Sequence, residues 1–466
     1  MRTYQDLLAV GENEKDRMEF VRGAVRDHTS SDDYKIAAAA ESYYAKRNQT
    51  IVKYQKFLYN SNGQAYPDLF SANYKTRTLM FRHFVIQQVQ YVLSNGVSFG
   101  QGGTKDRLGR DFDNRLQQLA KKAMVDGVAF GFWNLDHLEV FPFADTPHAP
   151  GFVPLYDEED GSLKAGVRYW SLNGAETKRY TLYEMDGYTE YIQKKNEDIQ
   201  IRQPKRPYRQ TVRVDATGEE TVEAGDNYPG FPIIPMYAND LRESELVGVQ
   251  ESIDCYDFIK NGLANEIDDS SGVYWVLKNS GGMDDLDIAR FLDRMRTLRA
   301  AAVDSEDGGG AEAHTLDIPY EARSAMLDRL RSDLHEDFQL VDMEKIMSGN
   351  LTATAIRMGY QSQDDKCGDF EYCIRDFIGK LLKLLGIDDT PSFQWNRIAN
   401  QLEETQTVLT AATYLDDEAI LRHLPWLTPE EVDEILKRKD AEGLERLGVS
   451  NNGSGAQMDG TGAATA

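Results

Sequence analysis

The sequence predicts an α+β fold in which helices dominate. Two observations lead to this class. Apolar residues recur at helical spacing before residue 127 and again beyond residue 241, whereas residues 128–238 alternate apolar and polar side chains. The chain has 466 residues, of which 41% are hydrophobic, so it can bury a large core but exceeds one ordinary domain. We therefore expect two to four structural units.

Helices joined by polar segments are expected before residue 127. The alanine-rich stretch 37–48 has high helix propensity. A second helix is expected over 74–93, because its apolar residues recur on one side and the Asn-Gly pair that follows can end it. A third helix is expected over 112–125.

A glycine-rich segment, residues 100–111, separates the second and third helices. It contains Lys105, but a phosphate-binding loop needs Gly-Lys-Ser/Thr between a strand and a helix. Here a threonine precedes the lysine, and a helix precedes the loop. We therefore expect a flexible surface loop.

A β-rich insert is expected over residues 128–238. Runs of alternating side chains, separated by Gly-, Asp- and Asn-bearing turns, begin near residues 128, 138, 151, 165, 179 and 188. A further strand is expected over 231–237. The acidic residues 157–161 lack the alternating acids and the later glutamate of a calcium loop, so we expect a hairpin turn there.

Two amphipathic helices are expected, from about Val249 to Ile267 and over residues 320–338, on either side of a small unit. That unit contains a strand over 273–277 and a helix over 284–298. The apolar positions of the two helices lie three or four residues apart and so share a face. The candidate packing residues are Val249, Ile253, Tyr256, Ile259, Leu263, Met326, Leu330 and Leu334.

A polar loop over residues 339–354 leads into a long helix that ends at Gly386. The apolar stripe of this helix becomes nearly heptad-spaced, so the helix should pack lengthwise against others. Residues 395–446 are expected to form a small helical cap, with a helix starting at Thr428-Pro429. The Gly- and Ser-rich tail from residue 451 cannot bury enough surface to order itself.

The net charge of −25 argues against tight DNA binding, which needs clusters of Lys and Arg. It does not argue against a protein that surrounds moving DNA. Cys255, Cys367 and Cys373 have neither metal-site nor redox-motif spacing, so we expect reduced thiols that pack between helices. No apolar run approaches the ~20 residues of a membrane span, so no membrane contact is expected.

A search for catalytic patterns finds no nucleophile elbow, Walker loop or HExxH motif. The carboxylates Asp284, Asp285 and Asp287 could suggest a two-metal nuclease, but no second acidic cluster stands near a strand end. A solvated surface and a partner-docking site are the other interpretations of this cluster. We expect no enzymatic activity, no metal and no cofactor.

Four segments resemble those of one known family. They are FPIIPMYAND with ES-x-L-x-x-V at 231–249, MVDGVAFGFW at 124–133, VPLYDEEDGSLKAGVRYW at 153–170, and NLTATAIRMGY at 350–360. Their order resembles the portal proteins of tailed bacteriophages, particularly those of long-tailed phages of Gram-positive hosts. One departure is Thr352-Ala353-Thr354-Ala355, because the family often shows Ser-Gly before the last alanine.

The resemblance implies the phage portal fold, with a β-rich wing, a helical stem, a small α/β clip, a tunnel loop with a long helix, and a helical crown. The implied boundaries are 1–240 for the wing with its β insert at 128–238, 241–267 and 318–338 for the two stem helices, 268–317 for the clip, 339–353 for the tunnel loop, 354–394 for the long wing helix, 395–448 for the crown and 449–466 for a disordered tail.

The implied function is a ring, usually a dodecamer, at one capsid vertex of the virion, assembled in the host cytoplasm. Double-stranded DNA would pass through it without sequence preference, driven in by the terminase motor and later ejected into the tail. Further implied partners are a head-completion or adaptor protein and the scaffolding and major capsid proteins. The clip carboxylates would dock partners, and the tunnel loop would offer Asp342, Glu344, Lys345, Ser348, Asn350 and Thr352 to the channel.

Two alternatives remain open at this stage. The protein could be an acidic scaffold or adaptor that binds protein partners without enclosing DNA. The loop over residues 339–353 could be a simple connector between helices.

Overall fold

The computed structural model describes residues 2–59, 63–68, 71–172, 176–214, 220–270, 274–278, 286–287, 290, 310–314, 319–342, 344, 358–396, 408–412, 414–422, 424, 427 and 429–446. The chain divides into a larger unit, residues 1–350 with 359–396, and a smaller unit, residues 351–358 with 397–466. Helix and strand make up 48% and 22% of the structure, which confirms a mixed protein with more helix than strand.

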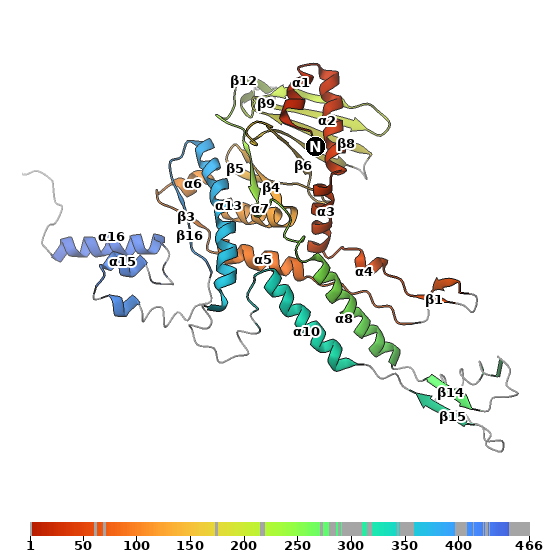
Figure 1. The fold of residues 1–466 in the computed structure, drawn as a ribbon. Helices are drawn as coiled ribbons and strands as arrows, with labels where there is room; N and C mark the ends of the chain where they lie inside the picture. Colours follow the sequence, from red (N-terminus) through yellow and green to blue (C-terminus); the bar gives the residue numbers. More distant parts are fainter. Residues whose placement is uncertain are drawn as a thin grey trace, which may run out of the picture. The chain divides into compact units, whose positions relative to one another are not determined.

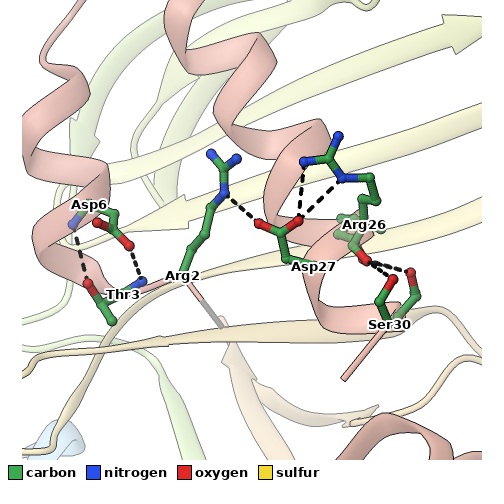
Figure 2. A network of polar contacts seen from close by, with 8 residues as sticks. Arg2, Thr3, Asp6, Arg26, Asp27 and Ser30 are labelled. Carbon is green, nitrogen blue, oxygen red and sulfur yellow. Dashed lines mark hydrogen bonds and ion pairs between the residues drawn. The ribbon is translucent and has the colours of Figure 1, made fainter. Parts of the chain in front are cut away.

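The larger unit opens with helices α1 (Tyr4–Val10), α2 (Glu14–Thr29), α3 (Asp32–Tyr44) and α4 (Thr50–Lys53) (Figure 1). Thr3 starts α1 through a capping box with Asp6, in which each side chain accepts a hydrogen bond from the other's backbone N–H. Figure 2 shows this box and, beside it, Asp27 of α2 accepting from Arg2 and Arg26. The helix predicted over 37–48 is confirmed as α3, which begins earlier because Ser31 caps it.

Residues 128–238 form two antiparallel sheets and a separate hairpin. A three-stranded sheet has the order β13-β4-β5, a five-stranded sheet has the order β10-β9-β8-β7-β6, and β11 pairs with β12. Their bounds are β4 Val128–Asn134, β5 His137–Pro142, β6 Gly151–Tyr156, β7 Leu163–Leu172, β8 Thr177–Glu184, β9 Gly187–Lys194, β10 Gln200–Arg206, β11 Arg209–Val214, β12 Glu220–Asp226 and β13 Ile233–Tyr237.

The predicted runs of alternating residues are confirmed as β4 to β9, and the later strand as β13. Strands β10, β11 and β12 are additional to the prediction. Strand β10 reads QIRQPKR, lies at a sheet edge and has no buried side chain. It therefore lacks the alternation of apolar and polar residues from which a strand could be predicted. The predicted hairpin turn at 157–161 joins β6 to β7, and the Asp157 carboxylate accepts from Gln5 and from the Glu159 backbone.

Helices α1 and α2 cover the five-stranded sheet and bury its apolar face. The buried side chains of this core include Leu7, Phe20, Val21, Val153, Leu155, Val167 and Leu182. Burying each such side chain contributes about 1.5–3 kcal/mol relative to exposure. The five-stranded sheet and the N-terminal helices are therefore one packed body.

A second layer consists of α5 (Met80–Leu93), α7 (Phe112–Asp126) and α13 (Gln361–Leu385). The predicted stripe of α13 is confirmed over the described residues, since Tyr360, Cys367, Phe370, Ile374, Phe377, Leu381 and Leu384 are all buried. Ile356, predicted for the same stripe, lies outside the described residues. A Cβ added to Gly131 of β4 would lie 2.5 Å from the Phe377 ring, so glycine permits the close approach of α13. The helix ends at Gly386, which has a left-handed φ of 63°.

The glycine-rich segment at 100–111 lies at the surface, as predicted, and hydrogen bonds anchor its start. The Asp389 carboxylate accepts from the backbone N–H of Gly100 and Gln101, each at 3.0 Å, and from the Thr104 hydroxyl at 2.7 Å. A short helix α6 (Thr104–Leu108) follows, and β3 (Val97–Phe99) pairs with β16 (Pro391–Phe393). A protein carboxylate thus occupies the backbone donors that a phosphate would need.

Helices α8 (Gln250–Ser270) and α10 (Tyr320–Asp337) confirm the predicted amphipathic pair and lie side by side (Figure 1). The implied helix over 241–267 is wrong at its start, because residues 241–249 form turns. The predicted strand in the small unit is present as β14 (Tyr274–Lys278), paired with β15 (Gly310–His314). Most of the helix predicted over 284–298 lies outside the described residues.

The smaller unit contains α15 (Asp417–Arg422) and α16 (Pro429–Arg446), which confirms the predicted helix start at Pro429. Arg422 lies 3.5 Å from Asp433, and Lys439 lies 2.8 Å from Asp417, so the two helices are joined by charge pairs. Across the described parts of both units, no helix is long and apolar enough to cross a membrane.

Candidate functional site

The segment leading into α8 is folded into turns by its own polar side chains. Asn239 accepts from Glu243 N at 3.2 Å and donates to Glu243 O at 3.1 Å. The Ser244 hydroxyl donates to Val125 O at 2.6 Å and accepts from Leu246 N at 3.2 Å. These contacts satisfy backbone groups that a helix would otherwise use, which explains why α8 begins only at Gln250.

Two of the segments that carry the family resemblance meet here. Gly127, at the end of α7, has a φ of 87°, and a Cβ on it would lie 2.8 Å from Arg242 O. The backbone N–H of Ala238 donates to Gly127 O at 3.0 Å, and that of Glu245 donates to Met124 O at 3.0 Å. Residues 124–133 and 231–249 therefore form one joint, for which glycine is required.

Lys366 of α13 contacts the segment before α8 and the end of α10. Its ammonium lies 2.7 Å from the Glu245 carboxylate, donates to Phe338 O at 3.1 Å and sits 3.8 Å from the centre of the Phe338 ring. Both charged side chains are largely buried, at 15% and 12% exposure. Lys366 thereby holds the segment before α8 and the end of α10 against α13. The spacing of residues in the sequence does not predict this contact.

One face of α8 carries a row of polar side chains that bind an extended segment, residues 74–78. Asp257, Asn261 and Asn265 are buried at four-residue spacing. They accept from the backbone N–H groups of Thr78 at 3.1 Å, Thr76 at 2.6 Å and Tyr74 at 2.6 Å. We refer to these residues as the polar ladder.

The polar ladder explains a wrong prediction. The helix expected over 74–93 begins only at Met80, because residues before it stay extended along α8. Four residues of helix rise about 6 Å, and two residues of extended chain span about 6.6 Å, so alternate backbone N–H groups match every fourth helical residue. Burial raises the pKa of the Asp257 carboxyl above its ordinary value of 3.8.

The apolar side chains shared by α8 and α10 are buried near the joint and become more exposed with distance from it. Val249, Ile253 and Leu334 are buried, whereas Tyr256, Ile259, Leu263 and Leu330 are half-buried and Met326 is exposed. Farther along, Arg323 pairs with Glu266 at 2.6 Å. A groove of about 550 Å³ lies between α8, α10 and the extended chain, with Tyr54, Phe258 and Met326 among its walls.

The described residues that follow α10 form hydrogen bonds and ion pairs with side chains of α5, α10 and α13. Val341 N donates to Gln363 at 3.1 Å, and Val341 O accepts from Gln87 at 3.2 Å. Arg331 pairs with Glu344 at 2.7 Å and lies 3.9 Å from Asp342. The other residues predicted for the tunnel loop, namely Lys345, Ser348, Asn350 and Thr352, lie outside the described residues.

The remaining candidate residues are the carboxylates at 284, 285 and 287 and the three cysteines. Asp287 lies 3.6 Å from Arg290, and Asp284 and Asp285 lie outside the described residues. Within the described ranges, no group of three or more His, Cys, Asp or Glu side chains could hold a metal ion. Burial raises the pKa of Cys367 to about 12, as expected for a packing residue. Cys255 is exposed, so the expectation that it packs between helices is wrong for this chain.

Comparison with sequence families places most of the chain in one group. Residues 27–443 match the model described as "Phage portal protein, SPP1 Gp6-like". The chain is 24% identical over 427 residues to the portal protein of Clostridium phage phiCD119, covering 85% of this chain and 90% of that protein. It is 24% identical over 440 residues to the portal protein of Bacillus phage SPP1, covering 86% and 82%.

The solved structures that this chain is similar to include two necks of gene transfer agent particles. The neck of the empty particle, computed with C6 symmetry, has a TM-score of 0.41 and 11% identity, covering 76% of this chain and 91% of that chain. The neck of the native particle, computed with C12 symmetry, has a TM-score of 0.39 and 12% identity, covering 75% and 90%.

Proposed function

This chain belongs to the phage portal protein family of the SPP1 Gp6-like type, and on that premise we propose that it forms a closed ring at one vertex of a viral capsid. Double-stranded DNA would enter the head through this ring during packaging and leave through it during ejection. The observation that carries the proposal is the family match over residues 27–443. A location in the virion follows from the same premise.

We assign the parts of a portal to elements of the structure. The N-terminal helices and the sheets form the wing, α8 and α10 the stem, and the β14–β15 hairpin belongs to the clip. Residues from 339 onward form the tunnel loop, α13 the long wing helix, and the smaller unit the crown. The stem begins at Gln250 rather than at residue 241, since turns precede it.

The stem assignment is supported by how its apolar face is exposed. Near the joint this face is covered by the same chain, but Phe258, Ile267 and Met326 are more than one-third exposed farther out. Exposed apolar side chains on a helix pair indicate a surface that a partner covers. In a ring, the neighbouring stems supply that cover.

The charge of the chain suits a conduit for DNA. At −25 per copy, a ring repels phosphates and lets the duplex slide, so DNA contact would be confined to a few loop residues such as Lys345 and Asn350. Binding would be independent of sequence. The terminase motor, a head-completion or adaptor protein, and the scaffolding and major capsid proteins are the partners that this role requires, with the clip carboxylates as a docking site.

Electron microscopy of the purified protein tests the proposal directly. We expect closed rings with a central hole wide enough for a duplex. A chain that stays monomeric at every concentration, while binding other virion proteins, would instead support the alternative of an acidic adaptor that does not enclose DNA. Divalent-dependent DNA cleavage that is lost on replacing Asp284, Asp285 and Asp287 by alanine would contradict the view that the protein has a purely structural role.

A further inference from the structure

Residues 46–79, which we call the arm, differ in charge from the rest of the chain. The arm runs from the end of α3 to the start of α5 and contains α4, β1 (Phe57–Tyr59) and β2 (Ala65–Pro67). Its single acidic residue is Asp68, whereas its basic residues are Lys46, Arg47, Lys53, Lys56, Lys75 and Arg77. A basic segment in a chain of net charge −25 is a distinct surface.

The outer part of the arm is an apolar hairpin without cover. Strands β1 and β2 form a two-stranded sheet of their own. Phe57, Tyr59 and Tyr66 are 51%, 71% and 43% exposed, and the described residues of the hairpin carry no charge. An isolated two-stranded hairpin is marginally stable in water. Three exposed aromatic side chains on such a hairpin are typical of a surface that contacts another protein.

The base of the arm is held rigidly. The polar ladder binds residues 74–78 to α8, and the Tyr43 hydroxyl donates to Asp254 at 2.7 Å just before the arm begins. Lys75 donates to Val52 O at 2.8 Å and Arg77 to Asn48 O at 3.1 Å. A carbonyl accepts these hydrogen bonds without cancelling the charge, so the arm keeps its positive field.

An acidic surface lies on α10. Glu321, Asp328 and Glu336 are exposed and lie seven and eight residues apart, which places them on one helical face. The side chains that face the protein interior, such as Leu330 and Leu334, lie on the opposite side of the helix. Among the ion pairs of the described residues, none neutralises these three carboxylates. We call them the acidic stripe.

We propose that the arm of one copy docks on the acidic stripe of the next copy around the ring, with the aromatic hairpin buried in the contact. The proposal rests on the ring proposed above. Rotation around a ring brings two different surfaces of the chain together, and Figure 1 shows α8 between α10 and the arm. The arm and the acidic stripe are different surfaces of one copy and carry opposite charge, so they can pair between successive copies.

The first test is the hairpin variant Phe57→Ser/Tyr59→Ser/Tyr66→Ser. These side chains are exposed in one copy, so the thermal unfolding of the monomer should not change. We expect the concentration at which half the protein is assembled to rise about tenfold or more, as for the loss of aromatic anchors at an interface. Sedimentation velocity and electron microscopy measure the ring fraction. The matched control, Leu135→Ser/Met185→Ser, removes two exposed apolar side chains from turns elsewhere and should assemble normally.

A charge exchange tests whether the two named surfaces meet. Lys46→Glu/Lys53→Glu and Glu321→Lys/Asp328→Lys should each reduce assembly, and the combination of all four should restore much of it. A wild-type protein that forms no ring would overturn both the proposed function and this inference. Wild-type rings with an unaffected hairpin variant would overturn the inference alone. Normal rings that lose only DNA retention would also overturn it and make the arm a nucleic-acid surface.

Discussion

Single side chains fix the path of the chain where it enters α8. Gly127 is required for two separate reasons, a left-handed φ of 87° and a backbone carbonyl that would lie 2.8 Å from a Cβ. Lys366 is required because it is the cation beside the largely buried Glu245. A buried charge that loses its partner keeps its desolvation cost. We therefore expect both positions to be sensitive to conservative changes, Gly127 through backbone strain and Lys366 through the unpaired Glu245 carboxylate.

Gly127→Ala should lower the free energy of unfolding by about 2–4 kcal/mol, because strain in the left-handed region adds to a clash with the backbone of residue 242. Gly161→Ala is the matched control. It has a φ of 67° but no heavy atom within 4 Å of the added Cβ, so only the strain of about 1–2 kcal/mol should appear. Equal losses in denaturant unfolding would show that the close approach to Arg242 has no energetic weight.

Lys366→Met keeps the length of the side chain but removes its charge. Leaving the Glu245 carboxylate unpaired should destabilise the larger unit by about 1–3 kcal/mol. Lys380→Met on the same helix breaks a pair with Asp376 in which both side chains are more than half exposed. That control should cost no more than about 0.5 kcal/mol. A Tm for Lys366→Met equal to that of the control would refute the structural role of Lys366.

At the scale of secondary structure elements, the sequence predicts those segments whose partners are apolar and misses those whose partners are polar. The stripe of α13 was predictable because its burial follows hydrophobicity alone. Residues 74–79 were not, since their helix-like composition is overruled by side chains of α8 some 180 positions later. The signal available in the sequence was the four-residue spacing of Asp257, Asn261 and Asn265 on a helix that already had an apolar face.

At the joint, too, apolar contacts could be predicted from the sequence and polar contacts could not. The packing residues of α8 and α10 nearest the joint, Val249, Ile253 and Leu334, were predicted from their spacing, and they are buried. Lys366 could not be predicted, because a single lysine on a helix looks the same whether it reaches solvent or Glu245. The anchoring of the glycine-rich loop by Asp389 was equally hidden, since the two segments lie almost 290 positions apart.

Asn261→Ala should release the extended segment from α8. Its side chain accepts from Thr76 N and donates to Thr76 O at 2.7 Å, so the variant leaves both groups unpaired. Each half-buried backbone group left without a partner costs about 1–3 kcal/mol. Hydrogen exchange at Tyr74 and Thr76 should accelerate by about tenfold or more. Lys260→Ala, on the exposed side of α8, should leave these amides protected.

The ladder also predicts a pH dependence. Burial raises the pKa of Asp257 above its value of 3.8, so the folded state favours the protonated form. The unfolded chain then releases its proton first as pH rises, and the contribution of Asp257 to stability falls from pH 3.8 up to the raised pKa. Asp257→Asn keeps an acceptor for Thr78 but does not titrate. The stability of this variant relative to wild type should therefore increase with pH across this window, and a difference independent of pH would contradict the assignment.

At the scale of the whole molecule, the chain is two bodies. The larger unit contains every element of the joint, and the smaller unit has its own short helices, charge pairs and the buried Val432. Contacts within each unit therefore account for its stability. We assign the wall of the proposed ring to the larger unit.

Removal of residues 397–466 tests this division. Because the joint, the ladder and both sheets belong to the larger unit, a chain that ends at Asn396 should keep its main thermal transition within about 2 °C of the full chain. Differential scanning calorimetry should also show the loss of any smaller transition that belongs to α15 and α16. Electron microscopy of the shortened chain should still show rings, since the arm and the acidic stripe remain. A main transition lowered by 10 °C or more would mean that the smaller unit is part of the wall and not a separate body.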